Sequence, residues 1–139
     1  MNFDQLVVFF EQDVPFNRLL GMKVTHIEEG FVRTRVAPQP AHVGNPALPA
    51  MHGGVISSLA DAAGGLAVYS SLDPGHGCST VDLRVDYLRR GDPGVALECE
   101  TRVVRAGNRV AVTDSTVRQG ERVVATARAV YNIVSKPNG

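Results

Sequence analysis

The stretch MHGGVISSLADAAGGLAVYS, residues 51 to 70, determines how the rest of the sequence is interpreted. Its apolar residues recur at helical spacing and predict a helix from Gly53 to about Ser70, with one stripe facing a sheet. Asp61 is the only acid on this helix. The residues three and four positions from Asp61 are all small: Ser57, Ser58, Gly64 and Gly65. This face is therefore suited to close approach by a ligand or another backbone.

Two features of this helix have a functional and an ordinary interpretation. Asp61 is either a reactive carboxylate or a solvated acid, although a solvated face normally carries Lys, Glu or Gln and this one has none. His52, Gly53 and Gly54 leave the unpaired amides of the first turn open to a phosphate, a carboxylate or an oxyanion. The same three residues are equally compatible with a turn and a helix cap.

The separation of these two features along the helix limits how they act together. Seven residues from Gly54 to Asp61 correspond to roughly 10 Å of helix, so one chain does not bring both to a single carbonyl group. Two antiparallel helices related by a two-fold axis would place Asp61 of one copy beside the helix start of the other. The glycines would then allow two helices to meet.

The remaining sequence predicts a single α+β domain over residues 1–139. Residues 2–12 have the spacing of a short amphipathic helix, and residues 22–37 read as a hairpin that turns at Glu29 and Gly30. Three strand-like runs follow the long helix, and the last is split by a turn at RQGE: 78–89, 95–105 and 109–134. One helix must then cover the apolar face of a curled antiparallel sheet.

Simple alternation assigns two faces to the first of these runs. We expect one face to be covered by the core and to carry Val81, Leu83, Val85 and Tyr87. The other face is expected to be solvated and to carry Thr80, Asp82, Arg84 and Asp86.

Composition excludes several classes of function. Lys plus Arg and Asp plus Glu both number 14, so no overall field attracts nucleic acid or a membrane surface. The N-terminal residues lack the features of a signal peptide, and no apolar run is long enough to span a membrane. Cys78 and Cys99 do not have metal-binding spacing. We therefore expect a cytoplasmic protein without a metal ion.

HGGVISSLADAAGG, followed by STVDLRVDYLRRG, resembles the hotdog-fold acyl-CoA thioesterases of the phenylacetate-type (PaaI-like) branch. The likeness covers about residues 15–134. It implies a hotdog fold and hydrolysis of an aromatic or a short- or medium-chain acyl-CoA, with no cofactor apart from the coenzyme A of the substrate. It also implies homodimers with shared active sites, paired again into tetramers.

The resemblance also implies roles for individual residues. Asp61 is expected to be the catalytic general base or nucleophile, and the Gly53 amide is expected to polarise the thioester carbonyl. His52 would shape the loop before the helix. A hydroxyl on the following strand orients water in this family, and this is Thr80 or, by strand parity, Ser79. Further expected site residues are Asn45, as a ligand of the carbonyl, and Gly54, as a substrate contact.

Coenzyme A carries phosphates, which a protein of zero net charge must hold locally. The candidates lie at strand ends or turns, and each is equally compatible with an ordinary solvated arginine: Arg89, Arg90, Arg105 and Arg109. Two other functions stay open: a hotdog dehydratase or hydratase, and a non-catalytic acyl-CoA-binding module.

Overall fold

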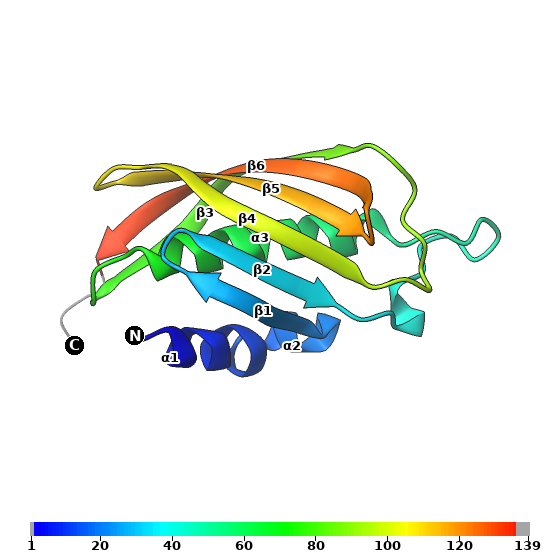
Figure 1. The fold of residues 1–139 in the computed structure, drawn as a ribbon, viewed down its shortest axis with the longest axis horizontal. Coiled ribbons are helices and arrows are strands. Elements are labelled where there is room, and N and C mark those ends of the chain that lie inside the picture. Colours follow the sequence, from blue (N-terminus) through cyan, green and yellow to red (C-terminus); the bar gives the residue numbers. More distant parts are fainter. Residues whose placement is uncertain (1, 136–139) are drawn as a thin grey trace.

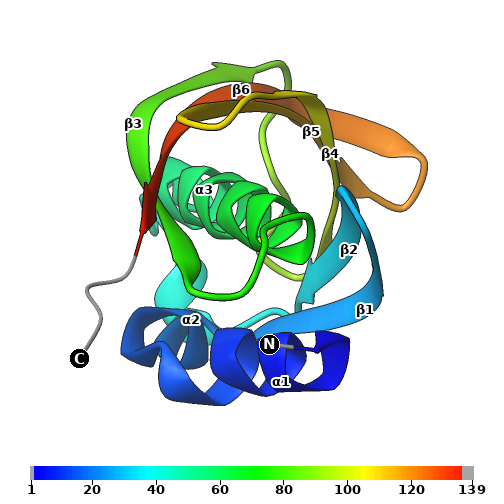
Figure 2. The same cartoon turned by 90° about the vertical axis from the view of Figure 1, so that its left-hand side faces the viewer.

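The computed structural model describes residues 2–135. A six-stranded antiparallel sheet with the order β1-β2-β4-β5-β6-β3 curls around the long helix α3, Gly53–Ser70. The sheet arches over α3 in Figure 1 and Figure 2. The strands are β1 (Met22–Glu28), β2 (Phe31–Val36), β3 (His76–Tyr87), β4 (Leu97–Ala106), β5 (Val110–Gln119) and β6 (Arg122–Ser135). The predicted α+β fold, with one central helix wrapped by a sheet, is confirmed.

The N-terminal segment lies on the side of α3 away from the sheet (Figure 2). The single helix predicted for residues 2–12 is in fact α1, Phe3–Val8, followed by a turn of π-helix, η1, over Phe9–Asp13. After it comes α2, Pro15–Leu20. A short 3₁₀ helix, η2 (Pro40–His42), precedes the loop that leads to α3. Leu6 and Phe10 anchor the segment to the core, where they are 2% and 3% exposed.

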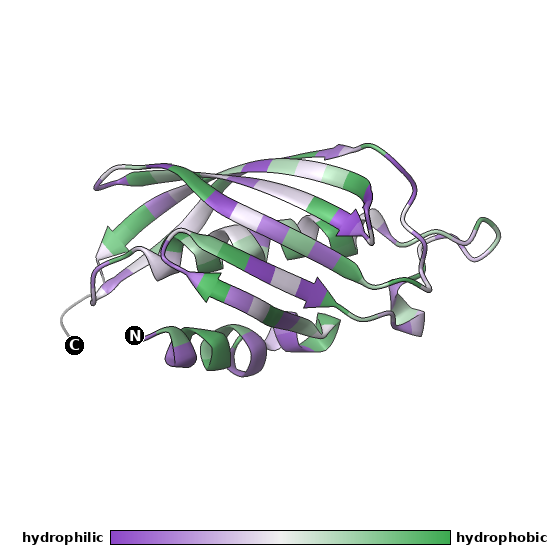
Figure 3. Ribbon diagram, viewed as in Figure 1, coloured by the Kyte–Doolittle hydropathy of each residue, from purple (hydrophilic) through white to green (hydrophobic). Residues whose placement is uncertain are grey.

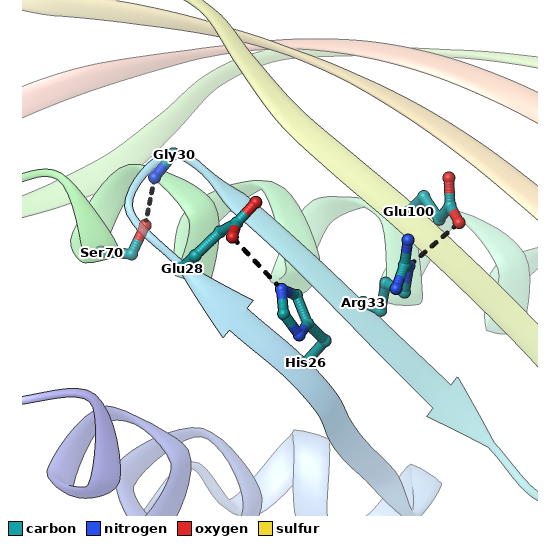
Figure 4. Close-up of polar contacts among 6 residues, drawn as sticks. All are labelled: His26, Glu28, Gly30, Arg33, Ser70 and Glu100. Atoms are coloured by element: carbon teal, nitrogen blue, oxygen red, sulfur yellow. Dashed lines mark hydrogen bonds and ion pairs between the residues drawn. The ribbon is translucent and has the colours of Figure 1, made fainter.

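The core lies between α3 and the inner face of the sheet, where apolar residues alternate with polar ones along the strands (Figure 3). Leu59, Val36 and Leu97 are completely buried there. The outer face carries charged pairs such as Arg33 with Glu100, 3.1 Å apart (Figure 4). Such exposed pairs contribute little to stability, so the fold depends on burial of the inner face.

The face assignment predicted for β3 is wrong in its first half, because Val81 is a β-bulge. Thr80 pairs with Tyr131 and Asp82 pairs with Val130, which leaves Val81 as an extra residue, 65% exposed. A bulge of one residue reverses the parity of the strand. Thr80 therefore shares the inner face with the residues after the bulge: Leu83, Val85 and Tyr87.

The tip of the first hairpin is tied to the end of α3. Gly30 adopts a positive φ of 75° in the β1–β2 turn. Its N–H donates to Ser70 Oγ at 2.9 Å (Figure 4). This contact fixes the C-terminal end of α3 against β1 and β2. Within residues 2–135, none of the helices is both long and apolar enough to cross a membrane.

Candidate active site

The first turn of α3 is capped by His52. His52 Nδ1 accepts the Gly54 N–H at 2.8 Å, so the ring is the N-cap of the helix. A Cβ on Gly54 would come as close as 2.8 Å to the same nitrogen. Gly54 was predicted to contact substrate, but its amide is already taken by the cap. The helix cap therefore uses the amide of Gly54, and a ligand would have to use another amide of the same turn.

Gly53 presents the free amide. As the first helical residue it has no partner four positions back, and no acceptor for its N–H is found in the described part of the chain. Its carbonyl accepts the Tyr87 hydroxyl at 3.1 Å, which holds the peptide against β3. The preceding loop is fixed because His52 N–H donates to the His42 carbonyl at 2.7 Å. The turn thus presents one oriented, unpaired donor.

Asp61 lies in the middle of α3 and is held from β3. The Thr80 hydroxyl donates to Asp61 Oδ1 at 2.8 Å, which leaves the other carboxylate oxygen available. Thr80 was predicted to orient water, and its contact with Asp61 forms because the bulge at Val81 turns Thr80 inward. Ser79, the alternative, pairs with Asn132 and is exposed on the outer face, so it does not face Asp61 of the same chain.

The hydroxyl of Tyr131 explains one of the mid-helix glycines. Tyr131 Oη donates to the Asp61 backbone carbonyl at 2.7 Å. A Cβ on Gly64 would overlap Tyr131 Oη, whereas a Cβ on Gly65 would make an ordinary 3.8 Å contact with the ring. The glycines were predicted to admit a second helix. Gly64 instead admits a side chain of the same chain, and only Gly65 is left open on the half-exposed face.

Burial keeps the groups around Asp61 uncharged. The Cys78 thiol lies 3.7 Å from the Gly65 carbonyl, and burial together with the charge of Asp61 raises its pKa to about 12. Burial likewise raises the pKa of Tyr131 far above its usual range, again with a contribution from Asp61. Neither the Cys78 thiol nor the Tyr131 hydroxyl therefore adds a negative charge beside Asp61 at neutral pH.

Two arginines share a hollow with the start of α3, and two do not. Arg89 and Arg90 line a hollow of about 340 Å³ together with Gly53, Tyr87 and Leu88. Arg105 and Arg109 line a separate hollow at the β4–β5 turn. Figure 1 shows that turn at the opposite end of the sheet from the start of α3. The predicted set of four arginines is thus divided within one chain.

Asn45 lies in the loop before α3 and stabilises that loop. Its side-chain oxygen accepts the Ala47 N–H at 2.9 Å, and the residue is exposed. The structure does not bring Asn45 to Asp61 of the same chain. Among residues 2–135, no three His, Cys, Asp or Glu side chains gather in a way that suits a metal ion.

Two comparisons identify the family of this chain. The model of the thioesterase superfamily matches residues 48–126. The chain is 37% identical over 138 residues to the medium/long-chain acyl-CoA thioesterase YigI of Escherichia coli K12, covering 89% of this chain and 88% of that protein. The chain belongs to the thioesterase superfamily.

Solved structures share the fold of this chain. A Streptococcus mutans protein with bound acetyl-CoA has a TM-score of 0.74 at 27% identity and covers 83% of this chain and 90% of its own. A thioesterase from Haemophilus influenzae has a TM-score of 0.86 and covers 99% of this chain and 94% of its own. At 17% identity the second match shows the fold alone. The predicted hotdog thioesterase fold is confirmed.

Sequence reasoning missed two tyrosines that donate hydrogen bonds to α3. Tyr87 was assigned only to the apolar face of a strand, yet its hydroxyl holds Gly53. Tyr131 was not singled out at all, although it contacts both Asp61 and Gly64. The available signal was the cost of a mid-helix glycine, about 1 kcal/mol relative to alanine, which implies a close neighbour without identifying it.

Proposed function

We propose that this chain hydrolyses the thioester bond of medium- or long-chain acyl-CoA, with Asp61 as the catalytic carboxylate. The observation that carries the proposal is the Asp61 carboxylate on a half-exposed helix face, held by Thr80 at 2.8 Å with one oxygen free. The printed activity of the relative YigI supports acyl-CoA as the substrate and favours longer acyl groups than the aromatic or short ones expected from the sequence.

We infer that the active site is shared between two copies of the chain. Asp61 and Gly53 are eight residues apart on one helix, about 12 Å, so they do not reach the same thioester group. Edge strand β3 supports the pairing of two copies, because it is long and exposes large side chains such as Val81 and Tyr87. The other edge, β1, is partly covered: Val24 N–H donates to Glu11. A dimer of dimers stays a prediction.

The chemistry follows from these positions. The free oxygen of Asp61 either takes a proton from water as that water attacks the carbonyl carbon, or attacks the carbon itself. The Gly53 N–H of a second copy stabilises the negative charge that develops on the carbonyl oxygen. The carbon–sulfur bond then breaks, and in the first route the proton held by Asp61 passes to the sulfur as coenzyme A leaves as a thiol. In the second route the acyl group is left as an anhydride on Asp61, and a water molecule then supplies a proton to the sulfur and its oxygen to the anhydride, which releases the free acid and restores the carboxylate. Thr80 orients the carboxylate.

The hollow beside Gly53 is the proposed binding site for the coenzyme A moiety. Arg89 and Arg90 are the two exposed cations of that hollow, and phosphates are well matched to arginine donors. Arg105 and Arg109 of the same chain are too remote to join them. The PaaI-like branch, a cytoplasmic location and the absence of a cofactor stay predictions.

The test is Asp61→Asn, measured by release of the coenzyme A thiol. The amide keeps the size of the side chain but loses basicity and nucleophilicity, so we expect kcat to fall by roughly 10²-fold to 10⁴-fold. Asp82→Asn, the same change on the outer face of β3, is the matched control and should leave kcat unchanged. Saturable binding without thiol release by the unaltered protein would instead show a non-catalytic binding module. A folded Asp61→Asn variant with activity close to the parent would exclude the mechanism.

A further inference from the structure

The loop between β3 and β4, residues 88–96, passes beside the start of α3 (Figure 1). It carries Arg89 and Arg90, the two arginines of the hollow beside Gly53. Both residues are exposed, and a long exposed side chain has many accessible rotamers. The backbone of this loop therefore determines where the two guanidinium groups can reach.

Gln119, the last residue of β5, anchors this loop to the sheet. Its side-chain oxygen accepts the Asp92 N–H at 2.8 Å. Its side-chain nitrogen donates to the carbonyls of Asp92 and Val95, at 2.7 Å and 2.9 Å, which matches the two N–H groups of an amide. Gln119 is only 7% exposed. One buried amide group thus makes all three of its contacts with the backbone of one loop.

The part of the loop that Gln119 contacts is a closed turn. The Val95 N–H donates to the Asp92 carbonyl at 3.3 Å, and the Gly94 N–H donates to Asp92 Oδ1 at 2.8 Å. An aspartate that accepts the N–H two residues further on is a common way to stabilise a turn. Gln119 therefore fixes a turn that is already closed by its own hydrogen bonds, and not one point of an open chain.

Two other contacts connect the same loop to β6 and to the residues before α3. The N–H groups of Leu88 and Arg89 donate to the Val124 carbonyl at 2.9 Å and 3.2 Å. The Gly91 carbonyl accepts the Met51 N–H at 2.9 Å, and a Cβ on Gly91 would lie 3.1 Å from Met51 Cβ. The arginine pair therefore lies between fixed points on both sides, and the anchored turn begins directly after the second of them.

We propose that Gln119 is a positioning residue for coenzyme A, because it fixes the segment that carries Arg89 and Arg90 before the substrate binds. This inference rests on the proposed binding of coenzyme A in the hollow beside Gly53. Gln119 does not line that hollow, so it acts through the loop. The Gly53 peptide is also held by the Tyr87 hydroxyl at 3.1 Å. Loss of the Gln119 contacts should therefore weaken substrate binding more than it slows the chemical step.

The test is Gln119→Met, which keeps the length of the side chain and removes its three hydrogen bonds. With acyl-CoA we expect KM to rise by roughly tenfold, the cost of ordering about one residue, and kcat to stay within about threefold of the parent. With the pantetheine thioester of the same acyl group, which lacks the phosphates of coenzyme A, KM should not change. Gln5→Met is the matched control, because the Gln5 side chain contacts only the backbone of Asn2 beside α1.

A double-variant cycle tests whether Gln119 acts through the arginines. In the Arg89→Ala, Arg90→Ala background, adding Gln119→Met should raise KM for acyl-CoA by less than about twofold, because contacts that act through one another are not additive. An additive increase, or an equal increase in KM for both substrates, would show a merely structural role and overturn the inference. Gln119→Glu keeps the acceptor of the Asp92 N–H and loses the two donations. It is the second variant if Gln119→Met does not fold, and the same separation of KM from kcat is expected.

The outcomes separate this inference from the proposed function. If the double arginine variant raises KM for acyl-CoA and Gln119→Met does not, the binding hollow survives and the positioning role fails. If neither variant changes KM, the hollow itself is wrong. Amide exchange gives a readout without substrate: the Asp92 N–H should exchange faster in Gln119→Met than in the parent. An unchanged rate at Asp92 would show that Gln119 does not fix the turn.

Discussion

The two glycine pairs of α3 look alike in the sequence but do different work in the structure. At the helix start, Gly54 is bound by the His52 cap and Gly53 keeps a free amide. In the middle, Gly64 makes room for the hydroxyl of Tyr131, and Gly65 stays on the half-exposed face. At the helix start both glycines contact the same chain, because the Gly53 carbonyl accepts the Tyr87 hydroxyl, whereas in the middle only Gly64 has a neighbour too close for a Cβ. A repeated sequence feature therefore did not indicate a repeated function.

The largest effect on stability is expected at the second pair. In Gly64→Ala the new methyl group would overlap Tyr131 Oη and lie 2.9 Å from Thr113 Oγ1. Both neighbours are buried, so we expect a loss of about 1–3 kcal/mol in the free energy of unfolding. Gly65→Ala has open space and should gain up to about 1 kcal/mol from helix propensity. Urea denaturation of the two variants measures the difference.

The double variant Gly64→Ala with Tyr131→Phe is the control for this pair. Removing the hydroxyl relieves the closest overlap, so part of the lost stability should return. Equal losses for Gly64→Ala and Gly65→Ala would contradict the distinction drawn between the two glycines. They would show that a second copy of the chain presses on Gly65 as closely as Tyr131 presses on Gly64.

The first pair allows a smaller effect to be measured, through its cap. His52→Ala removes the acceptor of the Gly54 N–H, and loss of an N-cap costs about 1 kcal/mol. His52→Asn supplies another good capping side chain and should recover most of that loss. Thermal denaturation of both variants tests this expectation. An asparagine as damaging as the alanine would mean that the ring of His52 matters for something other than the cap.

Most of the fold followed from the sequence because the long elements have strong periodicity. The start of α3 at Gly53, the turn at Gly30 and the turn before Arg122 all agree with the structure. The inner face of β3 did not follow, since alternation contains no sign of the bulge at Val81. The same bulge turns Thr80 inward, so the error lay at the candidate site, where regular rules are most often broken.

The site could be predicted only in part for a related reason. Asp61 was identifiable because an acid among small residues is unusual on a solvated helix face. The contacts of Tyr131 and Tyr87 were not, because both hydroxyls reach α3 across the fold, 70 and 34 residues away along the chain. Likewise, strand ends in the sequence do not reveal which arginines share a hollow.

The smallest expected effect is a pH dependence of the start of α3, where the first glycine pair lies. The second pair should not share it. His42, whose carbonyl accepts the His52 N–H, is 1% exposed, and neither ring nitrogen has a hydrogen-bond partner among the described residues. Burial lowers the pKa of His42 below its usual 6.5, an effect that the nearby Leu20 carbonyl only partly opposes. The folded state therefore keeps the ring neutral while the unfolded chain still takes up a proton.

The sign of this effect follows from proton uptake. The contribution of His42 to stability is fully present above the unfolded pKa of 6.5 and declines as the pH falls below it toward the lower folded pKa. His42→Leu has no ring to protonate, so its free energy of unfolding should fall less on acidification than that of the parent. Amide exchange at His52 in mild acid should also be faster in the parent than in His42→Leu, while the amides of Gly64 and Gly65 exchange alike in both. An identical acid response of parent and variant, at His52 as well as globally, would show that the buried ring does not link pH to the start of α3.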